Sequence, residues 1–199
     1  MESAERRKSS ADPREEAGLI AAAQRGDTAA FGMLVRLHQR TIYRLAYGLT
    51  RNASDADDLA QETFVRAYQA IARFRVGEPM QPWLSRIATN LAFSMFRRRK
   101  RRPEVPLEPL VEAGKQFRGG GEDPADVASN RQSQRMVAAA FEELSNEHRA
   151  VLALRVVQDM SYDDIARTLR VPIGTVMSRL SRARAELRAK LDARIGKQS

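Results

Sequence analysis

Residues 161–187 read SYDDIARTLRVPIGTVMSRLSRARAEL, and this stretch decides how the rest of the chain is interpreted. Ser161, followed three residues later by Asp164, is a capping-box signal that predicts a helix start. Val171-Pro172 ends that helix, because proline lacks a backbone N–H and disfavours the helical conformation in the residue before it. Pro172 also suits the first turn of a new helix. We therefore predict two helices separated by a tight turn.

The second of these helices has one apolar and one polar face. Its apolar residues recur at helical spacing as Val176, Leu180, Ala183, Leu187 and Leu191. The opposite face carries serine and arginine, which can contact base edges and phosphates in a major groove. The pattern indicates a helix-turn-helix, although Arg170 stands where such motifs often have glycine. The alternative is a helical hairpin with a solvated basic face.

The composition of the whole chain limits the classes of protein that it can belong to. It has 199 residues, of which 43% are hydrophobic and 30% charged, with a net charge of +9 and a pI near 10.5. Such a balance favours a soluble protein with a polyanionic partner. There is no cysteine, which excludes disulfides and thiolate metal sites, and His38 and His148 lie far apart. No signal peptide or membrane span is visible, so we expect a cytoplasmic protein without membrane insertion.

Composition also divides the chain. We predict a disordered arm over residues 1–16, a helical domain over 17–102, a linker over 103–128 and a second helical domain over 129–199. The linker stretch holds several prolines, a Gly119-Gly120-Gly121 run, and two basic against six acidic residues. The predicted fold class is all-α, with two small helical domains joined by a flexible linker, the C-terminal one containing the helix-turn-helix.

A strongly acidic helix is predicted in the first domain, starting at Ser54 as its cap. Asp55, Asp57 and Asp58 suit a helix N-terminus, because carboxylates there interact favourably with the helix dipole. That reason does not extend to Gln61 and Glu62, which lie beyond the first turn. These last two share a face with Asp58 at helical spacing. An acidic face on so basic a chain suggests a protein partner.

A further helix is predicted to open at Trp83 and to end in the run RRRKRR, residues 97–102. Six adjacent cations are either a solvated helix end or a phosphate-binding patch. Asn90 interrupts the apolar face of this helix, and a buried amide there would need hydrogen-bond partners. Its surroundings are therefore a candidate binding site.

The order of these elements resembles that of a known family. The chain contains DADDLAQETFVRAY, then PWLSRIATNLA with a basic tail, then LSNEHRAVLALRVVQDMSYDDIA and PIGTVMSRLSRARAEL. This closely resembles bacterial RNA polymerase sigma factors of the extracytoplasmic-function (ECF) type, over roughly residues 18–102 and 130–192. The resemblance implies that the first domain is sigma region 2 and the second is sigma region 4.

The resemblance also implies roles for individual residues. Asp58, Gln61 and Glu62 match the face that docks on core RNA polymerase. Six residues match the site for the flipped base and the single strand of the −10 element: Ala70, Phe74, Trp83, Arg86, Ile87 and Asn90. Six more match the recognition of the −35 element: Thr175, Ser178, Arg179, Ser181, Arg182 and Arg184. An apolar slot with an amide suits a flipped base. An aromatic ring beside a cation suits the single strand that carries it.

We therefore expect a transcription initiation factor that binds core RNA polymerase and promoter DNA and assists promoter melting. It would have an anti-sigma factor as a probable partner, and no catalytic residue, cofactor or metal. One rival is a conventional helix-turn-helix regulator that binds duplex DNA as a dimer, which leaves the acidic face unused. The other is an enzyme that holds a metal at Asp55, Asp57 and Asp58, although neighbouring helix positions point in different directions.

Overall fold

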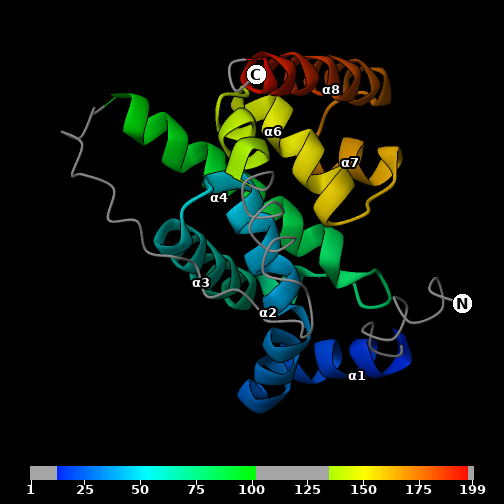
Figure 1. Cartoon of the computed structure of the whole chain (residues 1–199). Coiled ribbons are helices and arrows are strands. Elements are labelled where there is room, and N and C mark those ends of the chain that lie inside the picture. The colour runs from blue at the N-terminus through cyan, green and yellow to red at the C-terminus, as the bar shows by residue number, and fades with distance from the viewer. Residues whose placement is uncertain (1–12, 102–134, 197–199) are drawn as a thin grey trace, which may run out of the picture.

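The computed structural model describes residues 13–101 and 135–196, and all the regular secondary structure in these ranges is helical. The predicted linker over 103–128 and residues 1–12 of the predicted arm lie outside the described residues. The described elements are α1 (Pro13–Gln24), α2 (Thr28–Thr50), α3 (Ala53–Ala70), a 3-10 turn (Ile71–Arg73), α4 (Met80–Arg101), a helix over 135–142, α6 (Asn146–Leu152), a π-helical turn (Ala153–Val157), α7 (Tyr162–Leu169) and α8 (Ile173–Ile195). The all-α class is thus confirmed. Figure 1 shows α1–α4 as one group and the C-terminal helices as a second.

The first lobe, residues 13–101, is built around α2. Its start follows from Asp27, whose side chain accepts a hydrogen bond from the Ala30 backbone N–H at 3.0 Å and so caps the helix. The apolar stripe of α2 is buried at five positions: Phe31, Leu34, Ile42, Leu45 and Leu49. These side chains pack against α1, α3 and α4. Helices α3 and α4 therefore each bury one face against α2 and leave the opposite face on the outside of the lobe.

Three helix starts in this lobe differ from the prediction. Helix α1 begins at Pro13, where proline is well tolerated, so residues 13–16 belong to it and not to the predicted arm. The cap of α3 is Asn52 rather than Ser54, because the Asn52 side chain accepts from the Asp55 N–H at 3.0 Å. Helix α4 begins three residues before Trp83, which leaves Pro82 in its first turn.

The second lobe, residues 135–196, contains the helix-turn-helix. Ser161 caps α7 by accepting from the Asp164 N–H at 3.1 Å, as predicted. Arg170 ends α7 in the left-handed region, with φ 55°, and the next N–H returns to the Ala166 carbonyl. The stripe of α8 is buried at Val176, Leu180 and Ala183. Two apolar residues of this lobe are exposed: Val137 and Val156.

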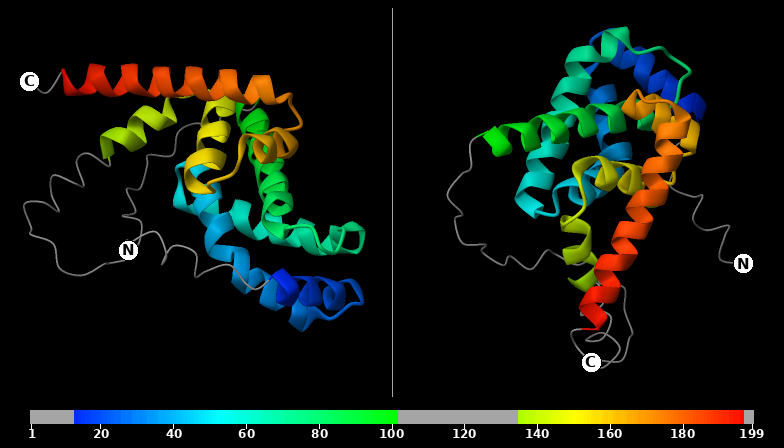
Figure 2. Two further views of the ribbon diagram at one scale, coloured as in Figure 1. Left: turned by 90° about the vertical axis from the view of Figure 1, so that its right-hand side faces the viewer. Right: turned by 90° about the horizontal axis from the view of Figure 1, so that it is seen from above.

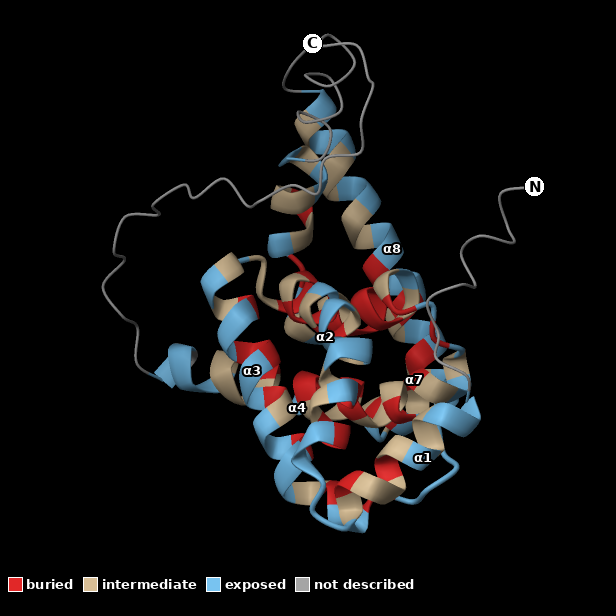
Figure 3. Ribbon diagram, turned by 90° about the horizontal axis from the view of Figure 1, so that it is seen from below, coloured by how far each residue is buried: buried red, intermediate tan, exposed pale blue. Residues whose placement is uncertain are grey.

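The two lobes lie against each other. Helix α2 contacts α6 and the π-helical turn, and α4 contacts α7, so one apolar core runs through both lobes. Figure 2 shows α8 lying across the second lobe and extending beyond it. The buried residues, red in Figure 3, face the interior of both lobes. Among the helices that the structure describes, none has the length and apolar character that a membrane crossing requires.

Candidate functional site

The acidic face, defined as Asp58, Gln61 and Glu62, lies on the outer side of α3. All three residues are exposed, while the neighbouring Leu59 and Thr63 are buried against the first lobe. Glu62 accepts a hydrogen bond from Arg66 at 2.7 Å on the same helix. Both residues of this pair are largely exposed, so it contributes little to stability. The face is therefore available to a partner.

Asp55 is not part of this face. Both of its carboxylate oxygens accept hydrogen bonds from Arg99 at the end of α4, at 2.6 and 2.8 Å. A paired, bidentate contact of this kind fixes the relative position of two helices. Part of the basic run that ends α4 therefore holds α3 and α4 together.

A pair of aromatic rings lies where α3 and α4 meet. The ring centroids of Phe74 and Trp83 are 4.8 Å apart, with their planes tilted by 50°. Phe74 is buried, and Gln24 donates to its carbonyl at 2.6 Å, so this residue belongs to the core. Trp83, like Ala70 and Ile87, is only partly buried. The two rings that the resemblance names for the −10 element are thus in contact, and Trp83 is the more accessible of them.

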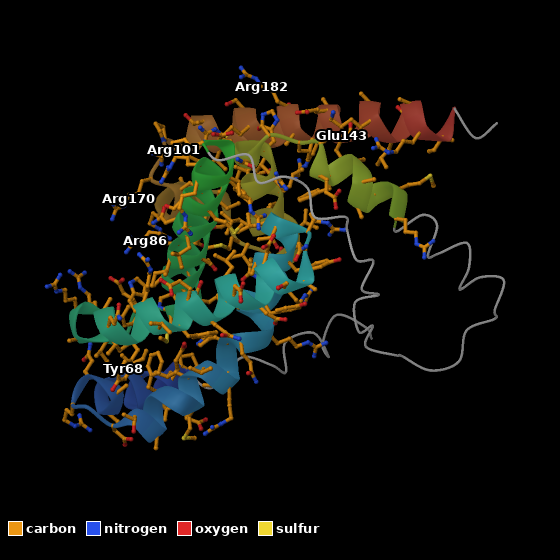
Figure 4. The ribbon with its side chains drawn as sticks, turned by 90° about the vertical axis from the view of Figure 1, so that its left-hand side faces the viewer. Tyr68, Arg86, Arg101, Glu143, Arg170 and Arg182 are labelled. Atoms are coloured by element: carbon orange, nitrogen blue, oxygen red, sulfur yellow. The ribbon has the colours of Figure 1, made fainter. Side chains whose placement is uncertain are left out.

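One face of α4 carries the remaining candidates. Trp83, Arg86 and Asn90 are spaced by three and four residues, and the Arg86 side chain is visible in Figure 4. Asn90 is exposed, so the expectation of a buried amide is wrong; the apolar residues around it point inward while it faces solvent. Its carbonyl accepts from Ser94, and no side-chain hydrogen bond to another described residue is present. The amide is free to bind a ligand from solution.

The outer face of α8 is basic and unpaired. Ser178, Ser181, Arg182 and Arg184 are exposed, and Thr175 and Arg179 are half-buried. Ser178 donates to the Thr175 carbonyl at 3.0 Å, which orients its hydroxyl along the helix. Figure 4 shows Arg182 pointing away from the body of the protein. Arg179, Arg182 and Arg184 form no ion pair with any residue in the described ranges.

No metal centre is found within residues 13–101 and 135–196. Groups of three or more histidine, aspartate or glutamate side chains with suitable geometry do not occur there. Asp55, the first member of the acidic triplet considered as a metal site, is bound to Arg99 instead. The arrangement of the described residues therefore offers binding surfaces, each on a helix whose other face is buried.

Comparison with known proteins assigns the chain to a family. Residues 34–102 match Sigma-70 region 2, and residues 134–187 match Sigma-70 region 4. SigW of Bacillus subtilis, an ECF RNA polymerase sigma factor, is 32% identical over 174 residues, which are 84% of this chain and 92% of that protein. The chain belongs to the ECF sigma factors. Such factors direct RNA polymerase to promoters, so the resemblance seen in the sequence is confirmed.

Other relatives agree with this assignment. SigE of Mycolicibacterium smegmatis is 38% identical over 166 residues, which are 82% of this sigma factor and 63% of the relative. The solved structure of CnrH with the cytosolic domain of CnrY has a TM-score of 0.66 at 29% identity, and covers 90% of this chain and 98% of that one. RpoE of Bartonella quintana, solved with the anti-sigma factor NepR, has a TM-score of 0.65 at 27% identity, with 81% and 96% covered.

One group of residues was not singled out from the sequence. Gln158 lies between the lobes, and so do its partners Thr41 and Gln81 in the first lobe. The available signal in the sequence was the single amide of Gln158, which directly follows Val156 and Val157 in the stretch ALRVVQDM. What that amide would bind could not be inferred from its neighbours in sequence.

Proposed function

We propose that this sigma factor divides promoter recognition and polymerase binding among three helix faces. The outer face of α8 reads duplex DNA at the −35 element, the exposed face of α4 holds the −10 strand, and the acidic face on α3 docks on core RNA polymerase. One observation carries the proposal above the others. The arginines on the outer face of α8 are unpaired, although the chain has acidic residues that could neutralise them.

The −35 assignment follows from side-chain chemistry on α8. Arg182 projects from the exposed face, and an arginine can donate two hydrogen bonds to a guanine in the major groove. Ser178 and Ser181 lie on the same side and can bond either bases or phosphates. Thr175, Arg179 and Arg184 lie at the edges of this face, where phosphates would pass.

The −10 assignment rests on α4. Trp83 offers a half-exposed ring on which a base can stack, and Arg86 offers a cation for the strand's phosphates. Asn90 adds an exposed amide that can donate to and accept from a base edge. Ala70 and Ile87 supply the apolar border of the slot, and buried Phe74 supports the ring of Trp83.

The polymerase assignment rests on charge. The acidic face is exposed on a chain with a net charge of +9, so it suits a basic protein surface. NepR was solved bound to a sigma factor that resembles this one, and we infer an anti-sigma partner for this chain as well. In this account the protein performs no chemistry of its own, needs no cofactor and acts in the cytoplasm.

Run-off transcription tests the proposal. Core RNA polymerase is supplied with the purified protein and a library of promoter-sized DNA fragments, and the transcripts are sequenced. We expect transcripts that start at a fixed distance downstream of a shared pair of sequence elements. Transcripts no more numerous or specific than those from core polymerase alone would contradict the proposal. A helix-turn-helix regulator would repress or ignore transcription in this assay.

A further inference from the structure

The contact between the two lobes is a specific interface built around Gln158. This side chain is 7% exposed, and its Nε2 donates to the Thr41 carbonyl at 2.8 Å. Its Oε1 accepts from Gln81 at 3.1 Å. Both ends of the amide are therefore bonded to the first lobe. Separation of the lobes would break both hydrogen bonds and leave the amide to water.

Close packing surrounds this amide. Gly48 of α2 faces the π-helical turn, and a Cβ placed on it would lie 3.4 Å from the Cβ of Ala153. Even without a side chain at this position, α2 and the π-helical turn are therefore within van der Waals reach of each other. Nearby, the Arg149 guanidinium lies 5.2 Å from the centre of the Phe96 ring, an arrangement that attracts cation and ring. Hydrogen bonds, packing and charge all hold the same interface together.

The interface also brings α7 over the −10 face. Trp83 and Arg86 line a cavity of about 350 Å³ whose other wall is formed by Asp164, Arg167 and Thr168 of the second lobe. Asp164 is paired with Arg167 in this wall, so α7 obstructs a strand at Arg86 by occupying its space and not by charge. A strand that stacks on Trp83 and contacts Arg86 would have to share this narrow space with α7.

We propose that the Gln158 interface is a self-inhibitory latch, which closes the free protein and places α7 over the Trp83 and Arg86 part of its −10 face until the lobes separate. The inference rests on the proposed role of Trp83 and Arg86 in binding the −10 strand. It assigns a separate function to Gln158 and Gly48, which are not among the residues proposed to bind that strand; Gln81, a partner of Gln158, lies two residues before Trp83 and links the interface to the −10 face. The outer face of α8 stays exposed in the closed form, so duplex DNA can bind before the latch opens.

A disulfide provides a direct test. The chain has no cysteine, so Gly48→Cys/Ala153→Cys introduces a single possible pair. The 3.4 Å between the two Cβ positions is close to the ~3.5–4.5 Å that a disulfide spans. Oxidation should lock the lobes together, and dithiothreitol should release them. Each sample is then its own folding control, checked by circular dichroism in both states.

Binding to short fluorescent single-stranded DNA of randomised sequence is the readout. The oxidised protein should bind at least about tenfold more weakly than the same protein after reduction, since only the open fraction is competent. Binding to duplex DNA through α8 should be the same in both states. Equal single-strand affinity before and after reduction, or failure of the disulfide to form, would overturn the latch and leave the −10 site standing. If neither form binds single strands, the proposed −10 site fails, and the latch falls with it.

A second variant opens the latch instead of locking it. Gln158→Glu places a carboxylate against the Thr41 carbonyl, which repels it, while keeping the size of the side chain. Single-strand affinity should rise by up to about tenfold. Gln39→Glu makes the same change of charge at an exposed position of α2 and should leave affinity unchanged. An equal response of the two variants would show a general effect of charge and would contradict the latch.

Discussion

Helices α3 and α8 are built alike and differ in what they expose. Each buries one stripe, with Leu59 at the centre in α3 and Leu180 in α8. The exposed face of α3 is acidic, and the exposed face of α8 is basic. The buried stripe fixes where each helix lies in the fold, but the charge of the opposite face determines the partner that it can bind.

The two faces also differ in how much of their charge is used within the protein. On α3, Glu62 is paired with Arg66 and Asp55 with Arg99, which leaves Asp58 and Gln61 without a partner among the described residues. On α8, the arginines of the outer face remain unpaired. A binding surface is thus better recognised by the charges that stay free than by the number of charges in a segment.

The largest effect should come from the buried stripes. Leu59→Ala and Leu180→Ala should each lower the free energy of unfolding by about 2–5 kcal/mol, because both side chains are almost fully buried. Gln61→Ala and Ser181→Ala, on the exposed faces of the same helices, should change it by no more than about 0.5 kcal/mol. Urea denaturation followed by circular dichroism measures all four. Similar losses for both kinds of residue would break the two-faced description of these helices.

Next in size is the discrimination of DNA sequence by α8. Arg182→Ala should reduce the preference at one or two −35 positions by roughly 1–3 kcal/mol, because a bidentate contact to guanine is lost. Arg184→Ala should weaken binding to all sequences alike and lower the slope of log K against log salt by about 0.9. Fluorescence anisotropy on single-base variants of the preferred site, at several salt concentrations, separates the two. Uniform losses from both variants would remove the direct-readout role of Arg182.

Asn90→Ala should affect promoter opening with little effect on stability. The exposed amide can bond a base only after the duplex has melted, so closed complexes should form normally. Permanganate reactivity of thymines in the −10 region should be lost. Because the side chain is exposed, unfolding free energy should stay within about 0.5 kcal/mol of wild type. A destabilised variant whose activity falls in proportion to its stability would indicate a structural role instead.

The smallest expected effect is on how stability depends on pH, and it concerns the residues at the starts of helices α7 and α3. The Ser161 hydroxyl and then Arg167 hold the pKa of Asp164 below its ordinary value of 3.8. A carboxyl with a lowered folded-state pKa stabilises the protein above its unfolded pKa, and this stabilisation is lost as pH falls through the folded value. Helix α3 starts at Asn52, whose capping side chain does not titrate.

The corresponding test compares Asp164→Asn with wild type. Thermal melts between about pH 5 and pH 2 should show a flatter pH dependence for the variant, by a small amount, since Asp164 is partly exposed and its partner Arg167 is largely exposed. Asn52→Ser, which replaces one neutral cap with another, should leave the pH dependence unchanged. A variant of Asp164 with the full wild-type slope would place the acid sensitivity elsewhere.

Sequence predicted most of the local structure because its signals are local. The cap at Ser161 and the stripe of α8, which is buried at Val176, Leu180 and Ala183, both depend on residues a few positions apart. The start of α3 lies two residues before the predicted cap because Asn52 and Ser54 are both good caps, and the Asn52 side chain is the one that accepts from the Asp55 N–H.

The relations between distant segments could not be predicted. Gln158 meets Thr41 across 117 positions of sequence, and nothing near either residue indicates the other. Asn90 was expected to be buried because its neighbours are apolar, yet only the rotation of α4 decides which residues of the helix face inward. For the same reason, the family resemblance named the candidates for the −10 site but could not predict their accessibility.

Capture of core RNA polymerase tests the division between the two faces most directly. Tagged wild type, Asp58→Lys/Glu62→Lys and Arg182→Glu/Arg184→Glu are compared in one pull-down, each checked by circular dichroism. Removing one partner of an interfacial charge pair costs about 2–5 kcal/mol, so the α3 variant should lose capture about 30-fold or more. Wild type and the α8 variant should capture polymerase equally. Undiminished capture by a folded α3 variant would contradict the assignment of the acidic face.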